Sequence, residues 1–175
     1  MIEAKGYSIW LEPEGEVKND LSKVIRDLSA QYNTPLFYPH VTLLGGIVLR
    51  EEEVVDRTKE IARNISPYTV AVTGTVDCED HWTKALFLVV SETVEIMAAN
   101  RVARTVCGME GEGYHPHLSL MYTEDIPIDQ RRKIASGLDP EALKGQFLVD
   151  KLHLYRTEGG VESWVKVGEF KLTGN

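Results

Sequence analysis

Two five-residue stretches of this chain are near copies of each other and lie 77 positions apart (117 − 40). Residues 39–43 read PHVTL, and residues 116–120 read PHLSL. Each stretch has a proline, a histidine, an aliphatic residue, a hydroxyl residue and a leucine in the same order. Self-similarity at a fixed spacing is typical of chains built from repeated structural units. The two stretches therefore predict two related halves.

Hydrophobic periodicity predicts the same order of elements in both halves. The first half has expected strands at residues 7–11, 40–44 and 70–76, and helices at 17–32 and 51–65. The second half has expected strands at residues 86–90, 117–122 and 147–155, and helices at 94–106 and 129–138. In the last helix we expect Arg131, Arg132 and Lys133 to face solvent. A final strand at residues 164–172, interrupted near Gly168, follows.

The spacing of 77 also relates other parts of the two halves. It maps Ile9 onto Leu86 (86 − 9) and Val70 onto Phe147 (147 − 70). We expect one domain over residues 1–175, with repeat one at about 7–77, repeat two at about 85–156 and a closing strand at about 162–173. Two such repeats can pack about a pseudo-two-fold axis. That symmetry would bring the equivalent histidine strands together.

Each repeated stretch has a polar pair on one side of its expected strand. Because strand side chains alternate between faces, His40 and Thr42 share one face, and His117 and Ser119 share one face of the other strand. Two histidines can serve as one general acid and one general base near neutral pH. Hydroxyl groups between them can bind phosphoryl oxygens. The pattern indicates hydrolysis of a cyclic phosphate.

The histidines have two other interpretations. A single strand histidine is usually a structural or surface residue, but two at equivalent positions, each followed by a hydroxyl residue, favour a site. A zinc site is the other chemical possibility, yet no carboxylate or cysteine stands at a familiar ligand spacing, so we expect no metal. We expect His81, His115 and His153 to be surface or loop residues.

Composition excludes several classes of protein. The net charge of −8 disfavours binding along a long nucleic acid, which requires a basic surface. No apolar run approaches the roughly 20 residues of a membrane helix, and the N-terminal residues lack the apolar core of a signal sequence. Two cysteines, Cys78 and Cys107, are too few for a disulfide scaffold. We expect a cytoplasmic monomer with no membrane partner, and a single disulfide stays an open alternative.

The paired histidine-x-(threonine or serine) motifs resemble those of the 2H phosphoesterase superfamily. The chain is also similar to the plant-type cyclic phosphodiesterases in length, in its opening Tyr-Ser-aromatic strand at residues 7–10 and in the Glu-x-Trp segment at residues 162–164. The resemblance implies a bilobal α+β fold, with an antiparallel sheet and outer helices in each lobe and a central cleft between the lobes.

The resemblance also implies an activity and a set of site residues. The activity is metal-independent and cofactor-free hydrolysis of ADP-ribose 1″,2″-cyclic phosphate to ADP-ribose 1″-phosphate, and of nucleoside 2′,3′-cyclic phosphates to nucleoside 2′-phosphates. His40 and His117 match the catalytic positions. The substrate-binding residues expected are Thr42, Ser119, Tyr122, Trp82 and Trp164. Packing in the core is an alternative role for the three aromatic residues.

Two rival functions stay open. The first is an enzyme that acts on the 2′,3′-cyclic ends of RNA fragments. The second is a module that binds nucleotides without turnover. The partner expected under the main interpretation is a small cyclic-phosphate nucleotide. Comparing the rates of hydrolysis of a mononucleotide and an oligonucleotide would separate this interpretation from the first rival.

Overall fold

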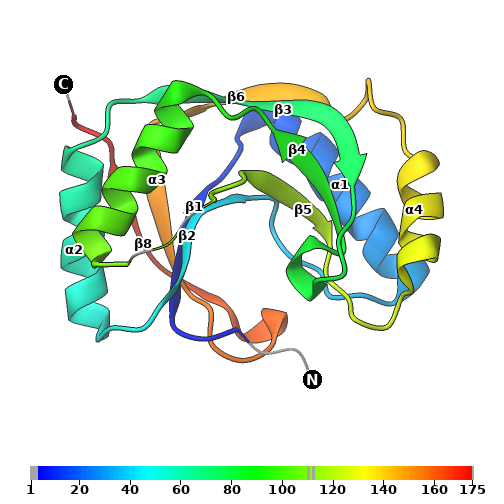
Figure 1. Ribbon diagram of the computed structural model, residues 1–175, viewed down its shortest axis with the longest axis horizontal. Coiled ribbons are helices and arrows are strands. Elements are labelled where there is room, and N and C mark those ends of the chain that lie inside the picture. Colours follow the sequence, from blue (N-terminus) through cyan, green and yellow to red (C-terminus); the bar gives the residue numbers. More distant parts are fainter. Residues whose placement is uncertain (1–3, 110, 112, 175) are drawn as a thin grey trace.

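One curled antiparallel sheet forms the centre of the molecule, and four α-helices cover it (Figure 1). The computed structural model describes residues 4–109, 111 and 113–174. The helices are α1 (Gly15–Tyr32), α2 (Glu51–Arg63), α3 (Val94–Cys107) and α4 (Ile128–Ser136). The strands are β1 (Tyr7–Leu11), β2 (Val41–Ile47), β3 (Tyr68–Asp77), β4 (Leu86–Val90), β5 (His117–Met121), β6 (Lys144–Val149), β7 (Lys151–Arg156) and β8 (Val165–Lys171). The expected α+β class is therefore confirmed.

The order of strands places the two motif strands side by side. The sheet runs β6-β3-β4-β5-β2-β1-β7-β8, so β2 and β5 lie at its centre. They are joined at a single pair of residues, Val41 and Leu118. Four strands lie on either side of this joint, and these two halves are the lobes that the resemblance implies. The position of each motif at the start of a central strand brings the two histidines to one region of the sheet.

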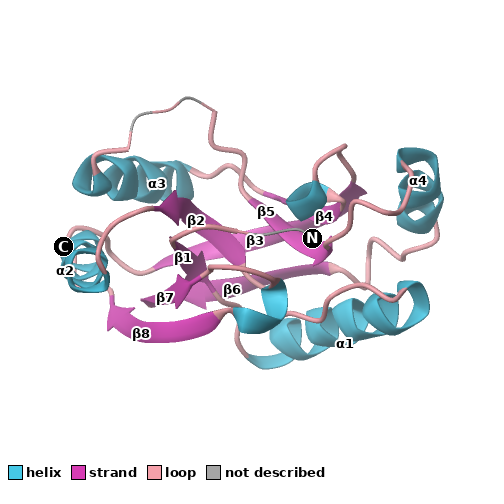
Figure 2. Cartoon of the chain, turned by 90° about the horizontal axis from the view of Figure 1, so that it is seen from below, coloured by secondary structure: helices cyan, strands magenta, loops and turns pink. Residues whose placement is uncertain are grey.

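Each half of the sheet is built from both sequence repeats. Strand β3, from the first repeat, pairs with β4 of the second, and β7 pairs with β1. The helices are exchanged as well, because α1 packs on β5 and β6 whereas α3 packs on β2. In Figures 1 and 2, α1 and α4 lie at one end of the sheet, and α2 and α3 at the other. The lobes are therefore interleaved in sequence.

The expected equivalence of Val70 and Phe147 is wrong. These residues are cross-strand neighbours in β3 and β6, and the positional counterpart of β3 is β7. The single strand expected at residues 147–155 is instead two strands, which are separated at Asp150. A continuous apolar pattern cannot reveal this break, because the chain moves to the other half of the sheet, where β7 lies between β1 and β8, without a glycine or proline.

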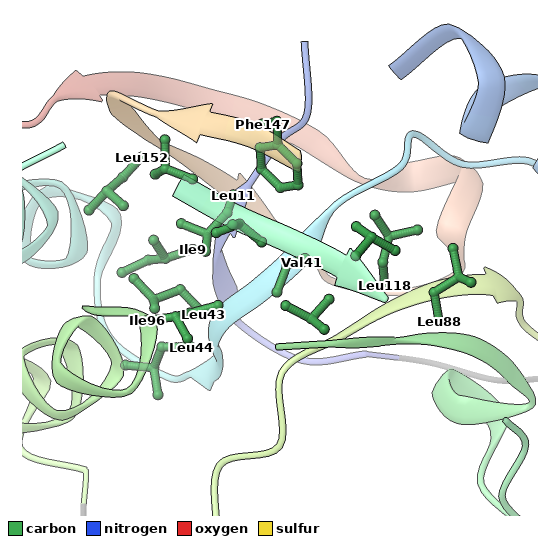
Figure 3. Close-up of a cluster of buried hydrophobic side chains, with 14 of the residues drawn as sticks. Ile9, Leu11, Val41, Leu43, Leu44, Leu88, Ile96, Leu118, Phe147 and Leu152 are labelled. Atoms are coloured by element: carbon green, nitrogen blue, oxygen red, sulfur yellow. The ribbon is translucent and has the colours of Figure 1, made fainter. Parts of the chain in front are cut away.

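The core lies between the helices and one face of the sheet (Figure 3). Its central side chains have no exposed surface; they include Ile9, Leu11, Val41, Leu43, Leu88 and Leu118. Burying each such side chain contributes roughly 1.5–3 kcal/mol. Because these residues alternate with Trp10, Thr42, His117 and Ser119 along their strands, the polar and aromatic side chains point to the opposite face.

Two side chains expected at the surface are buried. Arg131 is 3% exposed, because its guanidinium donates hydrogen bonds to the backbone carbonyls of Ile126, Glu79 and Thr123. His153 is also 3% exposed, on β7 beside Lys166. By contrast, His81 and His115 are exposed as expected. Among the described helices, none combines the length and the apolar character needed to cross a bilayer.

Candidate active site

The seven residues that the sequence predicts for the site line one cavity. Its volume is about 410 Å³, and its walls include His40, Thr42, Trp82, His117, Ser119, Tyr122 and Trp164. The residues come from β2 and β5, from the 3₁₀ turn Trp82–Lys84, from the segment after β5 and from the segment before β8. Both halves of the sheet therefore contribute to the walls.

The two histidines are held by the same local hydrogen bond. Nδ1 of His40 lies 2.7 Å from the carbonyl oxygen of Tyr38, and Nδ1 of His117 lies 3.0 Å from that of His115. A carbonyl oxygen can only accept, so Nδ1 carries a proton in both rings. In the neutral form, Nε2 then has a free lone pair, which can accept a proton from water or return one to a leaving group.

His40 is packed tightly in the wall of the cavity. It is 4% exposed and stacks on Trp10, with 3.6 Å between ring centroids and 10° between planes. Its Nε2 lies 3.3 Å from the hydroxyl of Tyr122. Burial lowers the pKa of His40 to about 4, although the Tyr38 carbonyl and the Glu12 carboxylate act in the opposite direction. The ring is therefore neutral at pH 7 in this environment.

His117 is more open to the cavity than His40. It is half-buried and contacts the edge of Phe87, with 5.4 Å between ring centroids. Burial lowers the pKa of His117, the His115 carbonyl opposes this shift, and the Lys84 cation adds to it. The charge on His117 also lowers the pKa of His40, which shows that the two imidazoles interact electrostatically.

The two hydroxyl residues differ in their hydrogen bonds. Ser119 donates to the carbonyl oxygen of Thr83 at 2.7 Å, so its proton is engaged in a hydrogen bond within the protein. The backbone carbonyl of Thr42 accepts a hydrogen bond from the Tyr114 hydroxyl at 3.0 Å, which fixes the start of β2. To donate to a phosphoryl oxygen, Ser119 must therefore exchange its bond to Thr83.

The three predicted aromatic residues form one wall. The ring of Tyr122 lies 5.5 Å from Trp82 and 5.9 Å from Trp164, both edge-on, and stacks on Phe37 at 4.0 Å. Within the described residues, the buried Nε1–H of Trp164 has no hydrogen-bond acceptor. Buried polar groups are rarely left unpaired, so this indole is a candidate donor to a bound ligand.

A second cavity of about 250 Å³ shares Trp82 and Tyr122 with the first. Its lining carries the carboxylates of Glu124, Asp125 and Glu162 and, among the described residues, no lysine or arginine. A neutral group with hydrogen-bond donors fits such a lining better than a second phosphate does.

Several functional positions were missed from the sequence. Ser8, Trp10 and Thr157 also line the main cavity, and the Ser8 and Thr157 hydroxyls lie 3.1 Å apart. The available signal was the alternation of Ser8 and Trp10 with Ile9 and Leu11, which places the first pair on the face of Thr42. The sequence indicates only that Trp10 belongs to a strand. Its contact with His40 joins β1 to the segment before β2, and such a contact between distant segments leaves no local pattern.

The described residues contain no group of three or more histidine, cysteine, aspartate or glutamate side chains arranged to hold a metal ion. Cys78 and Cys107 are free thiols, one partly and one fully buried. The open alternative of a disulfide between them is therefore not observed.

Comparisons with known proteins agree with this arrangement of fold and motifs. The model of the 2′-5′ RNA ligase superfamily matches residues 5–161. The chain belongs to this superfamily, that of the 2H phosphoesterases.

Two curated relatives and one solved structure cover nearly the whole chain. The cyclic phosphodiesterase of Arabidopsis thaliana is 26% identical over 92% of this chain and 92% of its own length. The 2′,3′-cyclic-nucleotide 3′-phosphodiesterase of Kluyveromyces lactis is 25% identical over 97% of this chain and 100% of its own. The crystal structure of TT0787 from Thermus thermophilus has a TM-score of 0.67 at 15% identity, over 97% of this chain and 99% of that one.

Proposed function

We propose that this protein is a cyclic phosphodiesterase that hydrolyses nucleoside 2′,3′-cyclic phosphates to 2′-phosphates and ADP-ribose 1″,2″-cyclic phosphate to ADP-ribose 1″-phosphate. The observation that carries the proposal is the pair of imidazoles, each with Nδ1 tied to a carbonyl, that line one cavity with Thr42 and Ser119. The names of the two curated relatives support the reaction class.

The proposed reaction uses one histidine on each side of phosphorus. Nε2 of His117 takes a proton from the attacking water as the new P–O bond forms. Nε2–H of His40 gives a proton to the ribose oxygen as its bond to phosphorus breaks. Thr42 and Ser119 donate to the two non-bridging oxygens, where negative charge is concentrated.

His40 must be protonated to act as the acid. Burial keeps its pKa at about 4. A cyclic phosphate carries a negative charge, and an opposite charge at contact distance favours the protonated imidazole. Substrate binding therefore helps to charge the acid. Burial lowers the pKa of His117, and the Lys84 cation adds to this shift, which favours the neutral base.

The test measures hydrolysis of both substrates, with and without EDTA, in wild-type protein and in His40→Ala and His117→Ala. Each substitution is expected to lower kcat/KM by about 10²–10⁴-fold, because each removes one proton transfer. The control is His115→Ala, whose exposed side chain is removed while its backbone carbonyl stays in place. Full activity in either histidine variant contradicts the mechanism, and loss of activity in EDTA contradicts its independence of metal.

Two rival functions have different outcomes in the same assay. An enzyme for RNA ends hydrolyses a 2′,3′-cyclic oligonucleotide faster than the mononucleotide. A module without turnover binds the cyclic nucleotide in wild-type protein but leaves it intact. We propose the mononucleotide as substrate, because the chain has a net charge of −8, and we propose a monomer, which sedimentation can test.

A further inference from the structure

His40 is the end of a stack of three aromatic rings. Trp10 stacks on His40 at 3.6 Å between centroids, and Tyr155 stacks on Trp10 at 3.8 Å with 21° between planes. Trp10 and Tyr155 are 3% and 5% exposed. Because the rings are buried and come from adjacent strands β1 and β7, movement of Tyr155 changes the surface on which His40 rests.

The far end of this stack is fixed by a carboxylate. Tyr155 donates its hydroxyl proton to Oε1 of Glu12 at 2.7 Å. Oε2 of Glu12 accepts from Nζ of Lys166 at 3.3 Å. The Glu12 side chain is only 9% exposed, although it follows directly on the end of β1. A carboxylate this well buried, and bonded to the ring that supports Trp10, is unusual for a purely surface ion pair.

We propose that Glu12 is a positioning residue for His40, and that it acts through the rings of Tyr155 and Trp10 to favour the imidazolium form of His40 during the reaction. The inference rests on the proposed function, in which His40 is the acid. Glu12 itself is separated from the cavity by the stack, and it is absent from the cavity lining among the described residues.

The charges around the stack support this role. Besides Glu12, the titratable groups that face His40 are His117 and the hydroxyl of Tyr122. Glu12 raises the pKa of His40, whereas His117 lowers it. A positive charge over the face of a tryptophan is also attracted to its ring electrons, so Trp10 favours the same protonation state.

Several polar and charged groups face Glu12. They are Lys166, His153 and the Tyr155 hydroxyl, with Glu169 on the far side of Lys166. Lys166 is shared between Glu12 and Glu169. Burial lowers the pKa of His117; among its charged neighbours, the Lys84 cation lowers it further, whereas the Glu79 carboxylate, which pairs with Lys84 at 3.0 Å, raises it. The stack therefore makes two histidines with the same local hydrogen bond unequal.

The experiment follows the imidazole signals of His40 and His117 by NMR from about pH 8 to about pH 2.5, below the His40 pKa of about 4, together with the pH dependence of kcat and kcat/KM. Glu12→Gln keeps the shape of the side chain and removes its charge. Its expected effect is a downward shift of the His40 pKa by about half a unit or more, with the His117 pKa unchanged. We expect kcat to fall about 3–10-fold with little change in KM.

Two further variants make the test specific. Glu169→Gln removes a carboxylate of the same ionic cluster that does not touch the stack, and it should leave the His40 pKa and kcat at wild-type values. Tyr155→Phe keeps the stacked ring but removes its bond to Glu12, so it should shift the His40 pKa in the same direction as Glu12→Gln and by less.

An unchanged His40 pKa and unchanged kcat in folded Glu12→Gln overturn the proposal, and so does an equal effect of Glu169→Gln. If Glu12→Gln does not fold, Tyr155→Phe is used instead, and an unchanged His40 pKa and kcat in that variant overturn the proposal. If the protein unfolds in acid before His40 titrates, the pKa values that limit kcat/KM at low and high pH are compared between the variants instead. Absence of hydrolysis in wild-type protein rejects the proposed function, but the NMR titration still decides whether Glu12 acts on His40.

Discussion

At the scale of single residues, the chemistry of the site depends on which ring nitrogens of the two histidines carry protons. In both histidines, Nδ1–H donates a hydrogen bond to the backbone carbonyl two residues earlier in the chain, on the other side of Pro39 or Pro116. Proline fixes its own φ angle, which restricts the backbone between each histidine and this carbonyl. The local sequence therefore sets the tautomer, while the neighbouring rings and charges set the pKa of each histidine.

Ser119→Ala tests the hydroxyl that donates to the Thr83 carbonyl. We expect kcat/KM to fall about 10–100-fold, because one charge-assisted hydrogen bond to the phosphoryl group is lost. The free energy of unfolding should change little beyond the loss of the bond to Thr83. The matched control is Ser136→Ala at the C-terminal end of α4, which should keep full activity. Wild-type kinetics in the first variant would exclude Ser119 from phosphate binding.

At the scale of elements, one arginine ties together the segments that carry the aromatic wall. Arg131 lies on α4 and donates to the carbonyls of Glu79, Thr123 and Ile126. Glu79 precedes Trp82, and Thr123 follows Tyr122 directly in the sequence. The short helix α4 therefore positions two wall residues that it does not itself contain.

Arg131→Met should lower the free energy of unfolding by about 3 kcal/mol or more, because buried carbonyls lose their donors. Urea denaturation at pH 7 measures this change. Arg132→Met is the matched control: its guanidinium is exposed and pairs with Asp129 within one helical turn, so we expect a change below about 0.5 kcal/mol. Equal stability of the two variants would show that the carbonyl contacts contribute nothing.

At the scale of the whole molecule, buried histidines make stability depend on pH. His40 and His153 are both buried, and burial lowers the pKa of each ring. The unfolded chain binds protons at these residues near the ordinary histidine pKa of about 6.5, whereas the folded protein does not. The contribution of these neutral histidines to the free energy of unfolding is therefore complete above about pH 6.5 and is lost as the pH falls toward about 4.

The free energy of unfolding should be lower at mildly acidic pH, about 4.5, than at about pH 7.5. His40 alone can contribute on the order of 3 kcal/mol by the time the pH reaches its folded-state pKa of about 4. Denaturant titrations at several pH values measure the slope. His40→Gln should reduce that slope, because glutamine does not titrate, and an unaltered slope would assign the pH dependence to other groups.

The sequence predicted the main parts of the fold and a set of residues that line one cavity. The alternation of His40, Thr42, His117 and Ser119 with apolar residues was enough to place each pair on one face of a strand. The spacing of 77 was enough to predict two related halves. The first signal is local and the second is a nearly exact repeat, so both can be recognised in the sequence without knowledge of distant contacts.

The exchange of β3 and β7 between the halves, the buried Arg131 and the stack of His40 on Trp10 were not predictable in this way. Each depends on which segments, tens of residues apart, become neighbours in the sheet. Alternation assigns a side chain to a face but does not say what packs against that face. The chain's own order of residues therefore determined which groups are available for chemistry, and only the tertiary structure decided their burial, their partners and hence their proton affinities.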